Sequence, residues 1–277
     1  MGLDVTESHA ARLPAIDDRW IPRAHERANL LEALVAGKMA GPEVSHPMDN
    51  VRRNIQLMCD GDLDKQFGMT GLQAFTPDEV FAIVAAASGF AADPAWTNGP
   101  VPVAPELVLA ACEAVGDRLA LAVERAETMI LATGHPVGLA HLYIEVGRAL
   151  RDRGVRILRP FDGVPWRDDD HAEPWEVRYL EGVAMLTDRA NMRHTHSGDP
   201  MSRMLEETRP DLVFADHGFA GAAIERGVDA VSIADVNDPA LIVAKAQGRT
   251  GPVTVMDDNV RPEDYWPCFQ AIVARLP

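Results

Sequence analysis

Apolar residues recur at helical spacing over much of the first 126 positions. Ile21–Ala36 carries this pattern, and another helix is predicted to begin at Pro105. Between them, Thr76–Glu79 has the spacing of a capping box, in which the side chains of the first and fourth residues each bond to the other's backbone amide. The pattern therefore predicts a helical N-terminal region over residues 1–126.

After residue 126, short apolar runs alternate with amphipathic segments. Met129–Thr133 and Val155–Leu158 are predicted strands joined by a helix over Val137–Arg153, which is the order of a βαβ unit. The alternation resumes at Pro210, with strands over Leu212–Ala215, Val231–Ala234 and Val253–Met256 and helices over Ala220–Arg226, Pro239–Ala246 and Glu263–Leu276. The sequence predicts an α/β fold, in which the N-terminal helical region packs on a doubly wound, mostly parallel, Rossmann-like sheet formed by residues 127–277.

One polar and acidic segment, Phe161–Glu176, interrupts this alternation. It predicts an irregular insertion, either a surface loop or a substrate lid bracketed by Trp166 and Trp175. Val183–Leu186 and Met192–His194 beyond it predict a hairpin.

Composition and charge narrow the classes of partner. The chain has 277 residues, of which 47% are hydrophobic, and 26 basic against 42 acidic residues give a formal charge of −16. Such a charge argues against nucleic acid and anionic membranes as partners. The longest apolar stretch, Val80–Ala92, is too short to span a bilayer, and the three cysteines form no CxxC motif. We therefore expect a cytoplasmic protein; a homo-oligomer is common at this size, but the sequence does not set the oligomeric state.

Acidic and amide side chains follow three of the predicted strands. Asp216, Asp235 and Asn237 come directly after two of them, and Asp257–Asn259 follows the third. Since the carboxyl ends of parallel strands open onto one rim, where ligands bind, these oxygen ligands predict a Mg²⁺ or Mn²⁺ site. Asp238, which precedes a proline, is predicted to cap a helix, and Asp257–Asn259 to support the ligands.

Two further segments offer groups for an anion. The turn that contains Thr133, Gly134 and His135 links a strand to a helix, so its backbone amides could hold a phosphate, or it could be an ordinary βα turn. His194 and His196 are two residues apart and face the same side of an extended segment that continues to Ser197. They could bind a metal, hold a phosphate, or act as general acid and base.

Three more residues are candidates by position. Asn50, in the polar segment Glu43–Arg53, could reach over the rim from the helical region, although the segment alone predicts a helix start capped near Ser45. Lys245 lies on the helix after Asp238 and could neutralise a phosphate or lie on a solvated face. His217 follows Asp216, which could itself be a nucleophile or a helix cap.

Several long motifs resemble an actinobacterial family known simply as phosphatase proteins. The motifs are ATGHPVGL (132–139), HTHSGDPM (194–201), DLVFADHGFAGAA (211–223), GVDAVSIADVNDPAL (227–241) and VTVMDDNV (253–260), with DNVRRNIQLMCDGD (49–62) and DPAW…APELVL (93–109) less specific. The resemblance implies phosphomonoester hydrolysis and carries His135, His194, His196, Asp216, His217, Asp235, Asn237 and Asp238 as matched positions without roles. The family pattern has Glu-Asn where this chain has Asp49-Asn50. The order of a helical region and an α/β region also resembles metal-dependent damage-control phosphatases.

These observations favour a metal-dependent phosphatase that acts on a small phosphorylated metabolite, such as a sugar, nucleotide or similar phosphomonoester. Asp216, Asp235 and Asn237 would hold the ion, and a metal-bound water or Asp216 would attack phosphorus. The Gly134 turn and the His194–Ser197 segment would hold the phosphate. His217 or His135 would handle the proton of the leaving group.

Two other functions fit parts of the pattern. An isomerase or lyase acting on a sugar or nucleotide could use the histidine pair for proton transfer, and its turnover would survive metal chelation. A non-catalytic nucleotide-binding module would be stabilised by its ligand without turnover, and its acidic strand ends would be helix caps.

Overall fold

The computed structural model describes residues 17–168 and 173–277. The N-terminal part contains η1 (Asp18–Trp20), α1 (Arg27–Ala36), α2 (Met48–Asp60), α3 (Leu63–Gln66), η2 (Leu72–Ala74), α4 (Pro77–Ser88) and α5 (Pro105–Glu124). Next come β1 (Thr128–Ala132), α6 (Ala140–Arg151), β2 (Arg156–Ile157), β3 (Trp175–Leu180), β4 (Val183–Asp188) and β5 (Asn191–Met192). The last elements are α7 (Asp199–Glu207), β6 (Leu212–Asp216), α8 (His217–Glu225), β7 (Ala230–Ala234), α9 (Pro239–Ala246), β8 (Val253–Val255), η3 (Pro262–Tyr265) and α10 (Trp266–Val273).

The strands form one eight-stranded, mostly parallel sheet in the order β3-β4-β1-β6-β7-β8, which confirms the predicted α/β fold. β1, β4, β6, β7 and β8 run parallel, and β3 and β5 pair with β4 in the antiparallel sense. On one side of β1, β2 pairs with its first half and β4 with its second half. The carboxyl ends of β4, β1, β6, β7 and β8 therefore point to the same rim.

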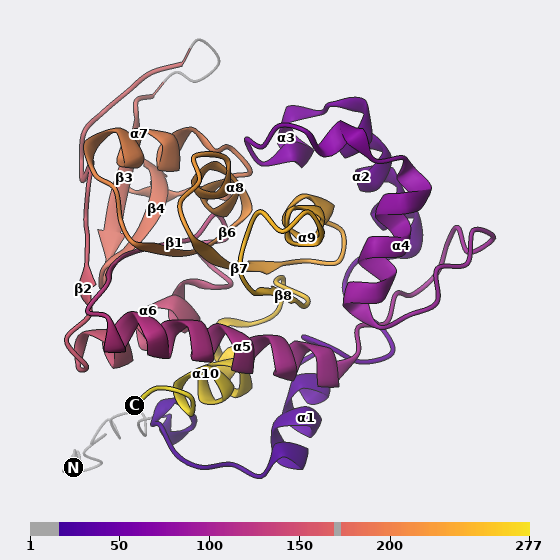
Figure 1. Ribbon diagram of the computed structural model, residues 1–277, viewed down its shortest axis with the longest axis horizontal. Helices are drawn as coiled ribbons and strands as arrows, with labels where there is room; N and C mark the ends of the chain where they lie inside the picture. The colour runs from indigo at the N-terminus through magenta and orange to yellow at the C-terminus, as the bar shows by residue number, and fades with distance from the viewer. Residues whose placement is uncertain (1–16, 169–172) are drawn as a thin grey trace, which may run out of the picture.

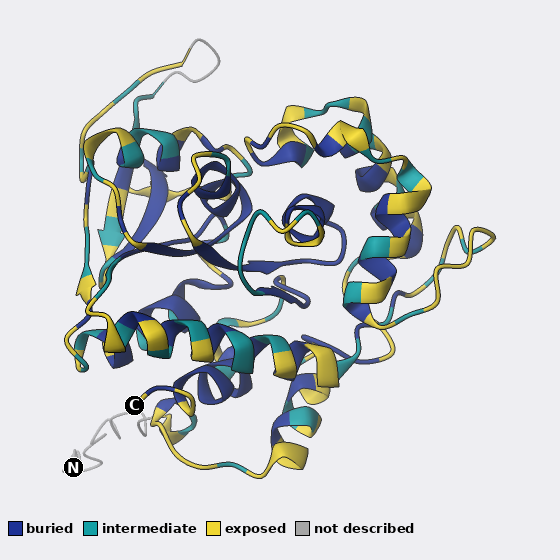
Figure 2. Cartoon of the chain, viewed as in Figure 1, coloured by how far each residue is buried: buried dark blue, intermediate teal, exposed yellow. Residues whose placement is uncertain are grey.

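Helices cover both faces of the sheet. Figure 1 shows α5, α6 and α10 on one side and α7, α8 and α9 on the other. The strands β6, β7 and β8 are buried along their whole length, as Figure 2 shows in dark blue. Burial on both faces is why these strands are mostly apolar and carry charged residues only at or just after their carboxyl ends.

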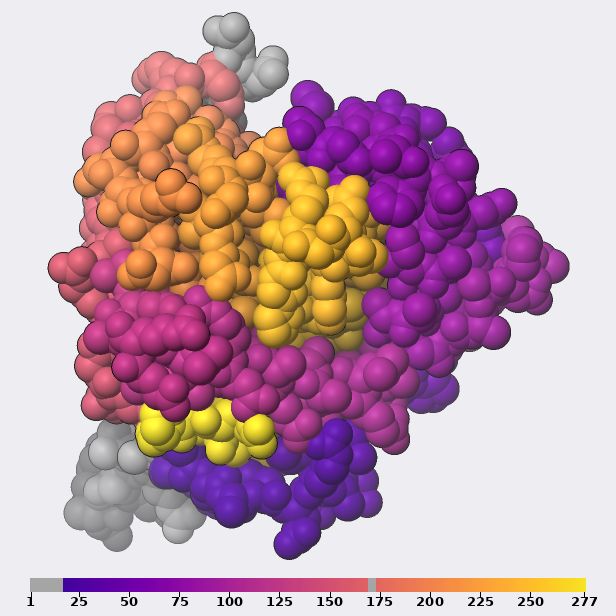
Figure 3. Space-filling view, viewed as in Figure 1, coloured from indigo at the N-terminus to yellow at the C-terminus, as the bar shows by residue number. Residues whose placement is uncertain are grey.

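The N-terminal helices close around one end of the sheet. α2 and α4 contact α9, and α5 contacts β8 and α10. In the space-filling view of Figure 3, the violet N-terminal residues lie directly against the gold segment that contains α9. One hydrophobic cluster runs through residues on both sides of position 126. This arrangement brings α2 and α3 to the rim of the sheet.

Helix α4 has the predicted capping box, whereas α1 begins later than predicted. The Glu79 amide donates to the Thr76 hydroxyl, and the Thr76 amide donates to the Glu79 carboxylate. The predicted helix from Ile21 begins only at Arg27, because Gln270 holds residues 21–23 extended. Its side-chain amide donates to the Ile21 carbonyl at 2.8 Å and accepts from the Arg23 amide at 3.1 Å.

The predicted insertion ends in a strand. Trp175–Leu180 is β3, the outer strand of the sheet, and its alternating charged residues obscured it in the sequence. The backbones of Trp166 and Trp175 bond to each other and close the base of the loop, of which residues 169–172 lie outside the described part. The predicted hairpin exists as the short β4–β5 pair, but His194 lies beyond it. None of the described helices is long and apolar enough to cross a membrane.

Candidate active site

Ten residues line a pocket of about 300 Å³ at the rim where the parallel strands end. They are His46, Lys65, His135, His194, His196, His217, Asn237, Asp238, Asp258 and Asn259. A larger hollow of about 490 Å³ lies beside this pocket and shares Asn259 with it, but no histidine lines that hollow. The concentration of imidazole and carboxylate groups makes the smaller pocket the candidate active site.

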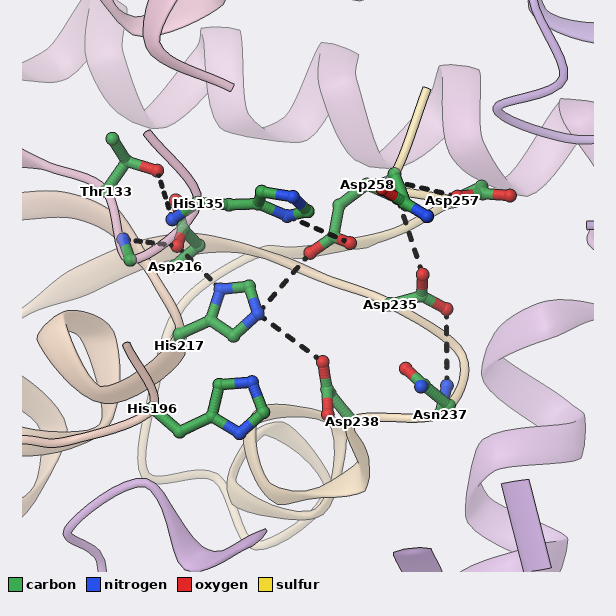
Figure 4. A network of polar contacts seen from close by, with 12 residues as sticks. Thr133, His135, His196, Asp216, His217, Asp235, Asn237, Asp238, Asp257 and Asp258 are labelled. Carbon is green, nitrogen blue, oxygen red and sulfur yellow. Dashed lines mark hydrogen bonds and ion pairs between the residues drawn. The ribbon is translucent and has the colours of Figure 1, made fainter. Parts of the chain in front are cut away.

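His217 is the centre of the pocket. It directly follows β6 and is buried, with a left-handed backbone at φ 47°. Its Nδ1 is hydrogen-bonded to Asp216 Oδ1 at 2.7 Å, and its Nε2 faces Asp238 Oδ2 at 3.5 Å and Asp258 Oδ2 at 3.7 Å (Figure 4). A non-glycine residue in the left-handed region costs about 1–3 kcal/mol, and such strain clusters at functional sites.

Carboxylates surround His217 and keep it protonated in the metal-free protein. Burial alone lowers the pKa of His217, but the hydrogen bond with Asp216 and the charges of Asp216, Asp258 and Asp238 outweigh burial and raise this pKa to about 9. A divalent cation at Nε2 could take the place of this proton, because it would balance the same carboxylates.

The other imidazoles approach His217 from two loops. His194 stacks on His135 with ring centroids 4.7 Å apart, and His196 stacks on His217 at 4.9 Å. His196 Nδ1 lies 3.0 Å from Asp64 Oδ2. Burial and repulsion from His217 lower the pKa of His194 to about 4, and the same two causes lower the pKa of His196. Both rings are therefore neutral near pH 7, the form that binds metal ions.

Glycines allow the loops after β1 and β5 and the start of α8 to approach each other this closely. A Cβ on Gly218 would overlap the carbonyl oxygens of His196 and Ser197, and a Cβ on Gly134 would overlap that of Thr195. The Thr195 amide donates to the Gly134 carbonyl at 2.9 Å. The loops after β1 and β5 and the start of α8 are thus fixed against each other through backbone contacts.

The remaining acids form a buried group next to His217. Asp235 accepts from the Asn237 amide and lies 3.5 Å from His46 Nε2; burial and the charges of neighbouring acids raise its pKa well above the usual value. Asp257 accepts from the Ser45 amide and hydroxyl. Asp238 does not make the side-chain cap that its position before a proline predicted. It faces His217 instead, which corrects that interpretation.

The pocket fits a divalent metal ion. Among the described residues, two groups bring three ligand atoms within 4.8 Å of one another: His194, His196 and His217, and His135, His217 and Asp258. Four buried atoms of described residues that line the pocket have no hydrogen-bond partner: His135 Nδ1, Asn237 Oδ1, Asp238 Oδ1 and Asp258 Oδ2. The separations of 3.5 and 3.7 Å around His217 Nε2 are close to the roughly 3.4 Å between two ligands of a tetrahedral ion with bonds of about 2.1 Å.

The predicted metal ligands share the rim but have other contacts. Asp216 Oδ1 accepts from the Gly134 amide at 2.7 Å and from His217, so this oxygen orients the imidazole. Asp235 bonds to backbone amides, and Asn237 Nδ2 donates to Asn50 Oδ1 at 2.9 Å. The candidate ligand set therefore moves from oxygen atoms alone towards imidazoles with carboxylates.

The predicted phosphate ligands do not all line the pocket. Thr133 accepts from the His135 amide and fixes the turn, while the Gly134 amide is bonded to Asp216. Ser197 lies outside the pocket lining, and its hydroxyl accepts from the Asp199 amide. Lys245 is exposed on α9, and its Nζ lies 3.5 Å from the Val253 carbonyl, outside the pocket lining.

Four residues of the pocket and its surroundings were not selected from the sequence as ligands: His46, Asp64, Lys65 and Asp258. Lys65 Nζ lies 3.5 Å from His196 Nδ1 and 2.8 Å from Asp64 Oδ2. Asp62 caps the short helix α3 by accepting from the amides of Asp64 and Lys65, which directs this helix at the rim. The sequence signal was the run Asp62–Lys65 itself, but only the packing of α3 against α2 and α9 places it here.

The chain belongs to a known protein family. The family model named Phosphatase matches residues 25–277, so the chain is a member of that family and a phosphatase, an enzyme that acts on phosphate esters. A curated relative, Phosphatase SCO2771 from Streptomyces coelicolor, is 35% identical over 253 residues, which cover 89% of this chain and 94% of that protein. No solved structure matches the chain.

Proposed function

We propose that this protein hydrolyses the phosphomonoester of a small metabolite with the help of a divalent metal ion. The observation that carries the proposal is His217, whose Nε2 faces two carboxylates while other imidazoles approach from neighbouring loops. Membership of the Phosphatase family supports the reaction class.

His217, His194, His196 and Asp238 would hold the ion. Imidazole ligands suit Zn²⁺ and Fe²⁺, whereas Mg²⁺ and Mn²⁺ prefer oxygen ligands. Of the two metals that the sequence predicted, we prefer Mn²⁺, because it is a transition metal and accepts imidazole together with carboxylates more readily than Mg²⁺. A bound ion supplies a water of lowered pKa and neutralises charge on the phosphoryl oxygens. Asp216 and Asp64 would orient His217 and His196 through Nδ1, as carboxylates do for many metal-ligating histidines.

Lys65 would bind the phosphate. It is the only lysine or arginine among the described residues that line the pocket, and its side chain is 16% exposed. Its position beside His196 lets Nζ reach an oxygen of an ester bound at the ion. This local positive charge, together with the ion, would offset the chain's overall charge of −16 for an anionic substrate.

His46 would give the leaving group its proton. Both nitrogens of His217 face other groups, whereas His46 lines the same pocket and its Nε2 lies 3.5 Å from Asp235 Oδ2. An imidazole held by a carboxylate is suited to general acid–base work. This assignment replaces the role that the sequence suggested for His217 or His135.

The test is phosphate release from a panel of sugar phosphates, nucleotides and other monoesters, with EDTA and with Mg²⁺, Mn²⁺, Co²⁺ or Zn²⁺ restored. We expect EDTA to abolish release, Mn²⁺ to restore it best, and Asp216→Asn to lower kcat strongly. Release that persists in EDTA would overturn the metal dependence. Conversion of a sugar phosphate without phosphate release would instead favour the proton-transfer alternative.

A further inference from the structure

The pocket contains more ligands than one ion can use. Five histidines and two aspartates line it. A catalytic ion takes about four to six ligands and leaves one position open for water or substrate. His217 cannot bridge two ions, because its Nδ1 is bonded to Asp216 and only Nε2 is available. The two ligand groups that share His217 therefore require either two alternative ion positions or a different bridging residue.

Asp258 has the position of a bridge. It follows β8 and is buried, and its two carboxylate oxygens face different imidazoles. Oδ2 lies 3.7 Å from His217 Nε2, and Oδ1 lies 3.4 Å from His135 Nδ1 (Figure 4). Both Asp258 Oδ2 and His135 Nδ1 are buried without a hydrogen-bond partner. Unsatisfied buried polar atoms are rare in folded proteins, so this pair points to a missing ligand on each side of Asp258.

The negative charge of the rim and of a bound phosphate together is more than one divalent ion balances. Asp216, Asp235, Asp238, Asp257 and Asp258 are all buried there. Asp257 is held by Ser45, Asp235 by the Asn237 amide and His46, and Asp216 by His217, which leaves Asp238 and Asp258 beside His217 Nε2. Once the histidines are neutral metal ligands, one divalent ion balances these two acids. Among the described residues of the pocket, only Lys65, itself paired with Asp64, is then left for the substrate phosphate.

We propose that the active site holds two divalent ions bridged by the carboxylate of Asp258. One ion binds His217, His194, His196 and Asp238 on the Oδ2 side. The second binds His135 on the Oδ1 side and has open positions for water and a phosphoryl oxygen, so it binds more weakly. Two ions about 3.5–4 Å apart clamp the attacking and leaving oxygens of an in-line displacement. This inference rests on the proposed phosphatase function and specifies its metal centre.

The experiment is a Mn²⁺ titration of the metal-stripped full chain, with bound metal measured by equilibrium dialysis and elemental analysis. Electron paramagnetic resonance detects coupling between paired Mn²⁺ ions. We expect two ions per chain with distinct affinities and a coupled spectrum at saturation. His135→Gln should keep one tight ion and lose both the second ion and the coupling. Asp258→Asn should bind metal without coupling.

His25→Gln is the matched control, because His25 lies outside the pocket, and it should keep two coupled ions. Circular dichroism of each stripped variant separates loss of a ligand from loss of the fold. One ion per chain at saturation, with phosphate release intact, would overturn the two-ion site and leave the proposed function. Two coupled ions without phosphate release from any ester would support the site and overturn the function.

Discussion

Removal of the charge on Asp216 should change how the stability of the metal-free protein depends on pH. Asp216 Oδ1 bonds to His217 Nδ1 at 2.7 Å inside the core. Against the effect of burial, this hydrogen bond and the surrounding carboxylates raise the pKa of His217 from 6.5 to about 9. Asp216→Asn keeps an oxygen for the Gly134 amide but removes the charge.

A histidine with a raised pKa binds its proton more tightly in the folded chain than in the unfolded chain. The stabilisation is therefore complete below pH 6.5 and disappears as the pH rises through about 9. The difference between these two pKa values corresponds to about 3 kcal/mol of unfolding free energy. The wild type should lose about this much between pH 6 and 10. The variant should lose less, because the hydrogen bond and charge of Asp216 no longer raise the pKa of His217.

Urea unfolding in EDTA, followed by tryptophan fluorescence at several pH values, measures this difference. Asp188→Asn is the matched control, because Asp188 is also buried but pairs with Arg193, which does not titrate in this range. Its variant should be less stable by a similar amount at every pH in the window. Equal slopes in the wild type and Asp216→Asn would refute the reasoning and indicate that Asp216 does not control the proton on His217.

Three other substitutions test separate parts of the structure. Lys65→Met should raise KM for a phosphate ester by about tenfold or more, because charge-assisted hydrogen bonds contribute about 1.5–3 kcal/mol. Lys38→Met is the control, because Lys38 lies outside the pocket lining, and it should leave KM unchanged. An equal rise in KM in both variants would contradict phosphate binding by Lys65. Gly218→Ala should abolish tight Mn²⁺ binding, measured by equilibrium dialysis, because the new Cβ displaces the loop that carries His196. Normal Mn²⁺ binding would show that this loop can move. Thr76→Ala should lower the unfolding free energy by about 1 kcal/mol without changing KM, and an altered KM would contradict a purely local cap.

The sequence predicted the elements whose signals are local. The Thr76 capping box and the helix over Pro239–Ala246 lie where the pattern placed them, because caps, prolines and apolar periodicity act within a few residues. The start of α1 was wrong, because Gln270, from the other end of the chain, holds residues 21–23 extended. β3 was missed because an outer strand carries charged residues on its exposed face.

For the site as well, the sequence predicted what depends on local signals and missed what depends on distant contacts. Because parallel strands end at one rim, the sequence placed Asp216, Asp235 and Asn237 at the correct edge of the sheet. It did not predict which side chains they contact there. Two features of the site depend on the backbone at His217. One is the Asp216 oxygen that contacts this imidazole, and the other is the position of Asp238, which faces the imidazole instead of capping α9. The positive φ of His217 cannot be predicted from its residue type. Lys65 reaches the pocket because Phe67, directly after α3, lies against Gly221 of α8, where a Cβ would overlap the backbone of Phe67.

The arrangement of carboxylates explains how an acidic protein could bind an anionic substrate. The acids at the rim differ in their contacts. Asp216 and Asp64 contact the Nδ1 atoms of His217 and His196, while Asp238 and Asp258 each face Nε2 of His217 and each have one oxygen without a hydrogen-bond partner. In the proposed metal centre, the first pair would orient the imidazoles and the second pair would attract the ions. With the ions bound as proposed, they and Lys65 would face the pocket, so the negative charge of the rim would concentrate positive charge where a phosphate would bind.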